Sequence, residues 1–219
     1  MLSSLLDFVL HLDRHLVDLV IHYDLWIYAI LFLVIFAETG LVVAPFLPGD
    51  SLLFAVGALA GVDRTGTLSA PLATFLLGAA AVLGNTANYT IGRALGPRAF
   101  TGRYRLLKVE HLKRTEEFFR RHGPLAIVLS RFMPIIRTVA PFVAGIGRMP
   151  TGRFQVYNLL GGFAWVTLFL WGGYLFGNIP LVKQNFGLVT LLIIVISLVP
   201  AAAGLLRRRP VSPASQSRS

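Results

Sequence analysis

The sequence predicts an all-α polytopic membrane protein that is built as an inverted repeat. Its 219 residues are 55% hydrophobic and only 14% charged, with a mean hydropathy of +0.71. Several apolar runs approach the length that crosses a bilayer, and two apolar stretches are interrupted by proline and glycine beside charged residues. We expect an N-terminal amphipathic helix, about four transmembrane helices and two re-entrant helical hairpins that enter from opposite faces.

Residues 1–23 predict the amphipathic helix, because leucine and valine recur at helical spacing with acids, histidines and an arginine on the opposite face. The first 20 residues have neither a basic start nor a small-residue cleavage pattern, so we do not interpret them as a signal peptide.

Residues 25–62 form the first long apolar run, which contains "ETGLVVAPFLPGD" in its middle. A straight helix of this length would measure about 57 Å, far beyond a bilayer core of about 30 Å, yet two full spans and a connector do not fit. We therefore predict one span followed by a re-entrant hairpin at about 38–62.

The rest of the chain divides by composition. Residues 67–91 are a Gly/Ala-rich span suited to close helix packing, and 93–121 are a basic segment expected as a helix on the membrane surface. Residues 154–176 and 186–206 are further spans, and 207–219 are a basic, Pro/Ser-rich tail that we expect to be disordered. Residues 24–206 would form one membrane domain.

The distribution of basic residues decides how residues 124–147 lie. Basic flanks occur at 93–121, at Arg148 and Arg153, and at 207–209. They all lie on the cytoplasmic side only if 124–147 is a re-entrant hairpin rather than a span. The N- and C-termini are then cytoplasmic, and the 38–62 hairpin enters from the opposite face, as in many secondary transporters.

The distribution of charge and the motifs also exclude several classes of function. The net charge of +10 is concentrated in 93–121, which favours contact with anionic membrane lipids over nucleic acid. We find no metal-ligand cluster and no Walker-type glycine loop, and the five histidines lie outside the predicted spans and hairpins. We therefore expect no catalytic residue, no metal and no cofactor.

Four charged residues fall within the two predicted hairpins: Glu38, Asp50, Arg131 and Arg137. A charge at bilayer depth costs roughly 2.5–3.5 kcal/mol on insertion scales, and such residues usually mark a functional site. A structural alternative is that the acids pair with the arginines to hold the bundle, or that all four reach the interface.

The two arginines lie in "RFMPIIRTVAPFVAGIG", on either side of Pro134. A proline breaks helical hydrogen bonding, so we expect Arg131 and Arg137 to turn toward one anion. Two guanidinium groups suit a phosphate, which accepts paired hydrogen bonds. In the other hairpin, the "PFLPG" turn would fold Asp50 back beside Glu38. Acids held between apolar surroundings and an arginine are candidates for proton coupling.

These motifs carry a resemblance to a known family. The pattern E-x6-P-x2-P-G-D at Glu38–Asp50, "YTIGRALG" at 89–96 and "SRFMPIIRT" at 130–138 resemble the DedA family of bacterial inner-membrane proteins, whose domain occurs in eukaryotic lipid scramblases of the VTT type. The resemblance covers roughly residues 25–180. By motif position, it adds Arg93, Pro134 and Thr138 to the possible site residues.

The resemblance implies transport of a polyprenyl-phosphate lipid, undecaprenyl phosphate in bacteria, across the inner (cytoplasmic) membrane for reuse of the carrier. It also implies coupling to protons. We therefore predict a polyprenyl-phosphate flippase in which Arg131 and Arg137 bind phosphate and Glu38 and Asp50 couple protons.

Three other functions remain to be weighed. A lipid phosphatase would need a histidine where Arg137 stands, and a proton-coupled antiporter for cations or drugs would be opposed by two buried arginines. A nonspecific phospholipid scramblase would use the same hairpins but depend less on the arginine pair.

Overall fold

The computed structural model describes residues 25–40, 49–63, 66–95 and 119–180, with single residues at 117, 182, 189 and 192. The predicted N-terminal helix (1–23), most of the basic segment, the span at 186–206 and the tail at 207–219 lie outside the described residues. So does the turn at 41–48, between the two limbs of the first predicted hairpin.

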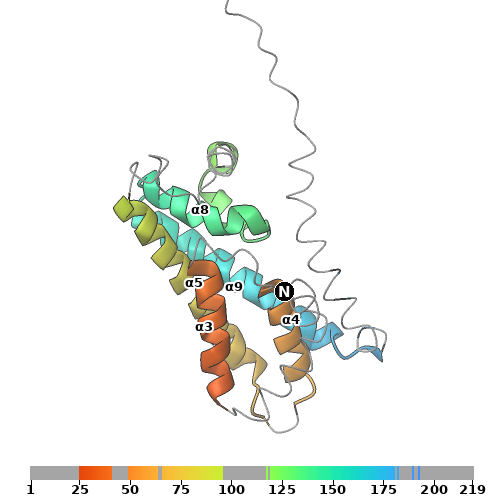
Figure 1. The fold of residues 1–219 in the computed structure, drawn as a ribbon. Helices are drawn as coiled ribbons and strands as arrows, with labels where there is room; N and C mark the ends of the chain where they lie inside the picture. Colours follow the sequence, from red (N-terminus) through yellow and green to blue (C-terminus); the bar gives the residue numbers. More distant parts are fainter. Residues whose placement is uncertain are drawn as a thin grey trace, which may run out of the picture.

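The described part of the chain is helical throughout, as predicted (Figure 1). It contains six α-helices and one short 3-10 helix: α3 (Trp26–Gly40), α4 (Gly49–Ala60), α5 (Ala70–Leu95), η2 (Gly123–Leu125), α7 (Ala126–Ser130), α8 (Pro134–Ile146) and α9 (Thr151–Phe176). Within this part, α5 and α9 are long and apolar enough to cross a membrane, and α3, α4 and most of α8 are shorter apolar helices.

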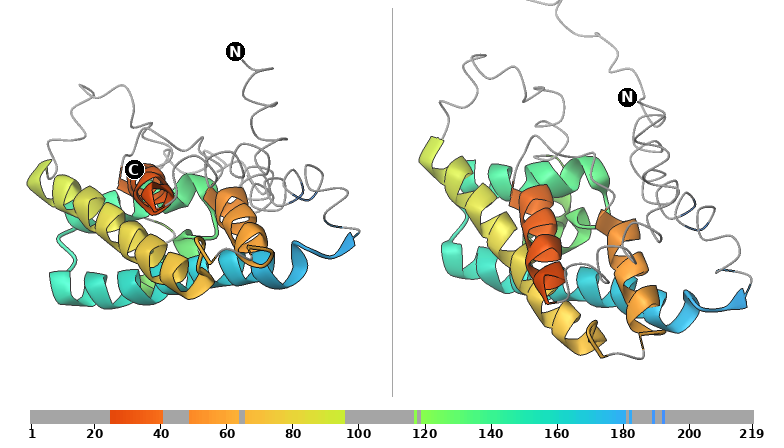
Figure 2. Two further views of the ribbon diagram at one scale, coloured as in Figure 1. Left: turned by 90° about the horizontal axis from the view of Figure 1, so that it is seen from below. Right: turned by 60° about the horizontal axis from the view of Figure 1, so that its bottom comes forward.

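The first half of the described chain comprises α3, α4 and α5, and the second comprises α7, α8 and α9. Each half places one helix against the long helix of the other half (Figure 2). Helix α4, from the first half, packs against α9 of the second half, and α8, from the second half, packs against α5 of the first. Helices α5 and α9 also pack against each other, and α3 lies along α5. One helix of each segment therefore rests on the long helix of the other half.

Glycines allow these helices to approach closely. A Cβ atom at Gly57 of α4 would overlap the carbonyl oxygen of Leu170 in α9, and one at Gly173 of α9 would overlap that of Phe54 in α4. The α5–α8 contact repeats the pattern, because a Cβ atom at Gly92 would overlap the carbonyl oxygen of Phe142. Small residues at helix contacts are the usual means of packing in membranes, where lipid offers no hydrophobic driving force between helices.

The apolar core lies between α3, α4, α5 and α9. Its largest fully buried members include Trp165, Ile27, Leu53, Leu77 and Leu170. Large apolar side chains also cover the outside of the long helices, including Phe75 and Leu83 on α5 and Val156, Leu160 and Leu168 on α9. An apolar exterior on the two longest helices is the surface expected next to lipid.

The break predicted beside the two arginines is present. In the second segment, α7 ends at Ser130, residues 131–133 form a turn, and α8 begins at Pro134. Proline is well suited to the first position of a helix, where its missing N–H would have no helical partner. In the first segment, α3 ends at Gly40 and α4 begins at Gly49. Arg131 stands in the described break, and Glu38 and Asp50 stand near the end of α3 and the start of α4.

Candidate functional site

The helix bundle encloses a set of buried polar and charged side chains. Among the described residues this set comprises Glu38, Thr39, Asp50, Ser51, Asn85, Asn88, Ser130, Arg131, Arg137, Thr138 and Asn158, each at most 8% exposed. All four charges predicted at bilayer depth are therefore buried. Buried polar groups need hydrogen-bond or ionic partners. The contacts of these side chains therefore show how the site is arranged.

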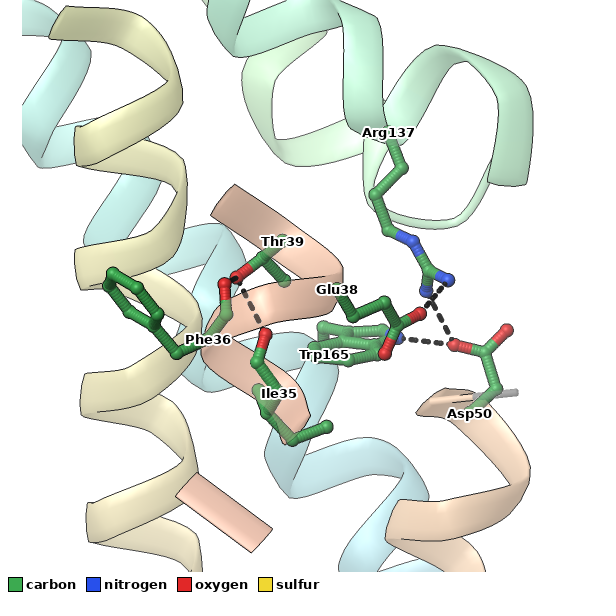
Figure 3. A network of polar contacts seen from close by, with 7 residues as sticks. All are labelled: Ile35, Phe36, Glu38, Thr39, Asp50, Arg137 and Trp165. Atoms are coloured by element: carbon green, nitrogen blue, oxygen red, sulfur yellow. Dashed lines mark hydrogen bonds and ion pairs between the residues drawn. The ribbon is translucent and has the colours of Figure 1, made fainter. Parts of the chain in front are cut away.

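Arg137 is bound between the two acids. Its Nη2 donates to Oε1 of Glu38 at 2.6 Å, and its Nη1 donates to Oδ1 of Asp50 at 2.8 Å. Figure 3 shows the guanidinium group pointing from α8 into the space between Glu38, on α3, and Asp50, at the start of α4. The predicted approach of Asp50 to Glu38 is thus confirmed, and one arginine links the ends of three helices.

The glycine of the P-G-D motif has a steric role in this arrangement. A Cβ atom at Gly49 would overlap Oε2 of Glu38, because the Glu38 carboxylate lies against the backbone at the start of α4. Any larger residue at position 49 would therefore push the carboxylate away from Arg137. The spacing from Glu38 to Asp50 serves to bring both acids to one guanidinium group.

Trp165 completes this cluster and was not predicted as a site residue. Its indole Nε1 donates to Oδ1 of Asp50 at 2.8 Å, and Cζ of Arg137 lies 5.1 Å from the centre of its ring (Figure 3). The side chain is fully buried. Tryptophans of membrane spans usually lie at the interfaces, so the position of Trp165 in the middle of a predicted span was the signal for a different role.

Arg131 has different partners from Arg137. Its Nη2 donates to Oδ1 of Asn158 at 2.7 Å and to the carbonyl oxygen of Ala81 at 3.3 Å. Its Nε and Nη1 atoms are buried and have no hydrogen-bond partner among the residues that the structure describes. Glycine provides the space beside it, because a Cβ atom at Gly162 would lie 3.2 Å from Nη2 of Arg131.

Asparagines position the helices around these charges. Asn158 of α9 donates through Nδ2 to the carbonyl oxygen of Val82 in α5 at 3.0 Å. Asn88 of α5 donates to the carbonyl oxygen of Thr138 in α8 at 2.8 Å. Sequence reasoning missed both asparagines, although amides within a span of glycine, alanine and leucine are a recognisable sign of interhelical hydrogen bonds.

Arg93 lies in a separate polar cluster near the end of α5. Its Nη1 donates to the hydroxyl oxygen of Tyr89 at 3.0 Å and to Oγ1 of Thr151, the first residue of α9, at 2.6 Å. The Tyr89 hydroxyl donates in turn to the carbonyl oxygen of Met149 at 2.6 Å. Tyr89 and Arg93, both in the "YTIGRALG" motif, therefore connect the end of α5 to the start of α9.

The structure thus brings together three of the four predicted charged residues. Glu38, Asp50 and Arg137 meet, whereas Arg131 is hydrogen-bonded to Asn158. In the described part of the chain, the two arginines share no hydrogen-bond partner. Their joint action on one anion stays a prediction, as do the roles of Pro134 and Thr138 in binding.

Together, the apolar helices and the buried charges define a polytopic helical membrane protein with a polar centre. Residues 47–175 match the model of the VTT domain. The chain is 47% identical over 206 residues to Protein DedA of Escherichia coli (strain K12), covering 94% of each chain. It is 36% identical to Inner membrane protein YghB of the same strain over 204 residues, which cover 91% of this chain and 87% of YghB.

A membrane protein of Mycobacterium tuberculosis (strain H37Rv) is 37% identical over 187 residues, which cover 84% of this chain and 82% of the relative. No solved structure matches the chain significantly. The chain belongs to the DedA family of VTT-domain membrane proteins. This membership confirms the resemblance drawn from the Glu38–Asp50 and Ser130–Thr138 motifs.

Proposed function

We propose that this protein transports a polyprenyl phosphate, of the undecaprenyl phosphate type, across the cytoplasmic membrane and couples this movement to protons. The observation that carries the proposal is the buried contact of Arg137 with both Glu38 and Asp50, at 2.6 and 2.8 Å. A guanidinium group held by two carboxylates inside an apolar bundle can exchange those partners for the oxygens of a phosphate.

The exchange links phosphate binding to protons. A carboxylate and a phosphate oxygen accept the same guanidinium N–H groups, so they compete for Arg137. When Glu38 or Asp50 takes up a proton, its charge and much of its attraction for Arg137 are lost, and the phosphate binds in its place. When the proton leaves, the carboxylate returns to Arg137 and the phosphate is released.

Arg131 supplies the second positive charge on the other side of the helix break. Pro134 begins α8, so Arg131 lies in the turn before this helix and Arg137 lies in its first turn. Thr138 contributes through its backbone carbonyl, because the hydrogen bond from Asn88 holds α8 against α5. The proposal assigns no binding role to Arg93, which joins α5 to α9.

The membrane arrangement that goes with this function has two re-entrant hairpins, around α3–α4 and α7–α8, that meet at the buried charges. Support comes from the exchanged packing of α4 on α9 and of α8 on α5. The prenyl chain would stay in the bilayer while the phosphate crosses at the charges. The relative YghB is named an inner membrane protein, and we assign the same membrane here, with both termini in the cytoplasm.

The test is a transport assay in reconstituted liposomes. Undecaprenyl phosphate should be moved by the unaltered protein and not by Arg131→Ala or Arg137→Ala, while both variants still insert into membranes. Arg→Lys at either position should keep only part of the activity, because lysine lacks the planar fork that matches phosphate oxygens. Full transport by the double alanine variant would contradict the proposal.

A further inference from the structure

Arg131 is a buried cation without an acidic partner among the described residues. It is 1% exposed, and its hydrogen bonds go to an amide and to backbone carbonyls. Arg137, by comparison, has two carboxylates. Leaving a buried charge without a counter-charge is strongly unfavourable. Two nitrogen atoms of Arg131 also have no hydrogen-bond partner in the described part of the chain. This arrangement suits a residue whose counter-charge arrives with a ligand.

Asn158 holds the guanidinium group of Arg131 in its observed orientation. Its Oδ1 lies 2.7 Å from Nη2 of Arg131 and accepts its shortest hydrogen bond. Its Nδ2 donates to the carbonyl oxygen of Val82 at 3.0 Å and to Oγ1 of Thr86 at 3.2 Å, so the amide is fixed against α5. The amide therefore orients the guanidinium group but contributes no charge to it.

We propose that Asn158 is a positioning residue that holds Arg131 in place without neutralising it, so that Arg131 stays available to an anionic phosphate while Arg137 is bound to its carboxylates. This inference rests on the proposed function. It names the residue that makes the two arginines different before the phosphate binds: Arg137 is paired by acids of the protein, whereas Arg131 is held by a neutral amide.

This role of the amide explains why asparagine suits position 158 better than aspartate or alanine would. An aspartate there would accept the same hydrogen bond but would form an ion pair with Arg131, and this carboxylate would compete with phosphate. An alanine would leave Arg131 without its orienting partner. Asparagine is the residue of this size that gives an acceptor oxygen and no charge.

The experiment is a thermal-shift titration of the purified full-length protein in detergent with undecaprenyl phosphate, comparing Asn158→Asp, Asn158→Ala and the unaltered chain. Both variants lose the hydrogen bonds that Nδ2 donates to Val82 and Thr86. Asn158→Asp should still be more heat-stable without lipid than Asn158→Ala, because only in the aspartate variant does Arg131 gain a counter-charge. Its Kd for the lipid phosphate should nevertheless rise about tenfold or more, as for loss of a charged hydrogen bond. Compared with Asn158→Ala, the aspartate variant should thus be more stable and yet bind the lipid phosphate less tightly, which a purely structural asparagine would not produce.

Two comparisons make the result specific. Asn178→Asp places the same substitution just after α9, where the native amide donates to the carbonyl oxygen of Ala58, and should leave the Kd unchanged. Adding Asn158→Asp to an Arg131→Gln background should cause no further loss of affinity, because the two residues act as one unit.

The outcomes separate this inference from the proposed function. No lipid-dependent shift in the unaltered chain would contradict the proposed function and with it this role. A normal shift in the unaltered chain with an unchanged Kd in Asn158→Asp would overturn the role of Asn158 alone. If Asn158→Asp does not fold, Asn158→Ala decides: a Kd like that of the unaltered chain overturns the role, and a weaker Kd that is not additive with Arg131→Gln supports it.

Discussion

Asp50 and Arg137, which are 87 positions apart in sequence, join the N-terminal turns of two helices through a hydrogen bond of 2.8 Å. An acid is favoured in the first turn of a helix by the helix dipole, whereas an arginine near that end is disfavoured. The buried position of Arg137 therefore depends on Asp50 and Glu38. Since α4 and α8 come from different broken segments, this contact links the two halves of the protein at its polar centre.

The first prediction separates a structural ion pair from a functional one. Arg137→Leu removes the guanidinium group that both buried carboxylates contact, which should lower the free energy of unfolding by about 3–5 kcal/mol. The triple variant Glu38→Gln, Asp50→Asn, Arg137→Leu removes all three charges and should recover most of that stability, but it should not transport lipid phosphate. The measurements are thermal unfolding in detergent and uptake in liposomes.

If the three charges serve only to hold the bundle together, the neutral triple variant should transport at a normal rate once it is folded. Normal transport by that variant would refute a direct role for Arg137 in moving the phosphate.

A second prediction concerns proton coupling. Glu38→Gln and Asp50→Asn keep an oxygen that accepts a hydrogen bond from Arg137 but remove the group that gains and loses a proton. Each variant should transport lipid phosphate more slowly, and the dependence of the rate on pH should become flatter than in the unaltered protein. The measurement is the initial uptake rate at a series of pH values. An unchanged rate and pH dependence in both variants would rule out coupling through these acids.

A third prediction tests Trp165 with a matched tryptophan. Trp165→Phe removes an N–H that donates to the carboxylate of Asp50, a bond to a charged group that is worth about 1.5–3 kcal/mol. Trp171→Phe, on the same helix, removes a bond of 3.1 Å to the neutral hydroxyl of Thr74. Transport should fall strongly in the first variant and little in the second. Equal effects on transport would show that Trp165 acts through packing alone.

A fourth prediction uses two adjacent glycines of α9. A Cβ atom at Gly173 would overlap the carbonyl oxygen of Phe54, whereas one at Gly172 meets nothing within 4 Å. Gly173→Ala should destabilise the α4–α9 contact by about 1–3 kcal/mol. Gly172→Ala should be neutral or stabilise the helix by up to about 1 kcal/mol. Thermal unfolding of the two variants gives the comparison, and similar stabilities would contradict the described packing of α4 on α9.

Much of the fold within the described residues follows from the sequence. Hydrophobic length predicts the two long spans, and the proline at position 134 predicts the helix break beside the arginines. The meeting of Asp50 and Glu38 at one site also follows, because charges in an apolar environment must find partners.

What sequence reasoning could not supply is the choice of partner for each charge. The four charges allow several pairings, and only the packing of α8 on α5 and of α4 on α9 determines that Arg137 receives both acids. Arg131 receives Asn158 because the glycines at 161 and 162 let α9 lie close to Val128 of α7 and to the Arg131 side chain. Long-range contacts of this kind have no local sequence pattern, so Asn158 and Trp165 were missed.

The central claim is that the buried arginines recognise the phosphate of one class of lipid. The most direct measurement compares the movement of undecaprenyl phosphate and of glycerophospholipids across liposomes that contain the purified protein, with and without a pH gradient. We expect rapid movement of undecaprenyl phosphate that responds to the gradient and little movement of glycerophospholipids. Equal movement of both lipids, unaffected by the gradient, would contradict the claim and identify a nonspecific scramblase.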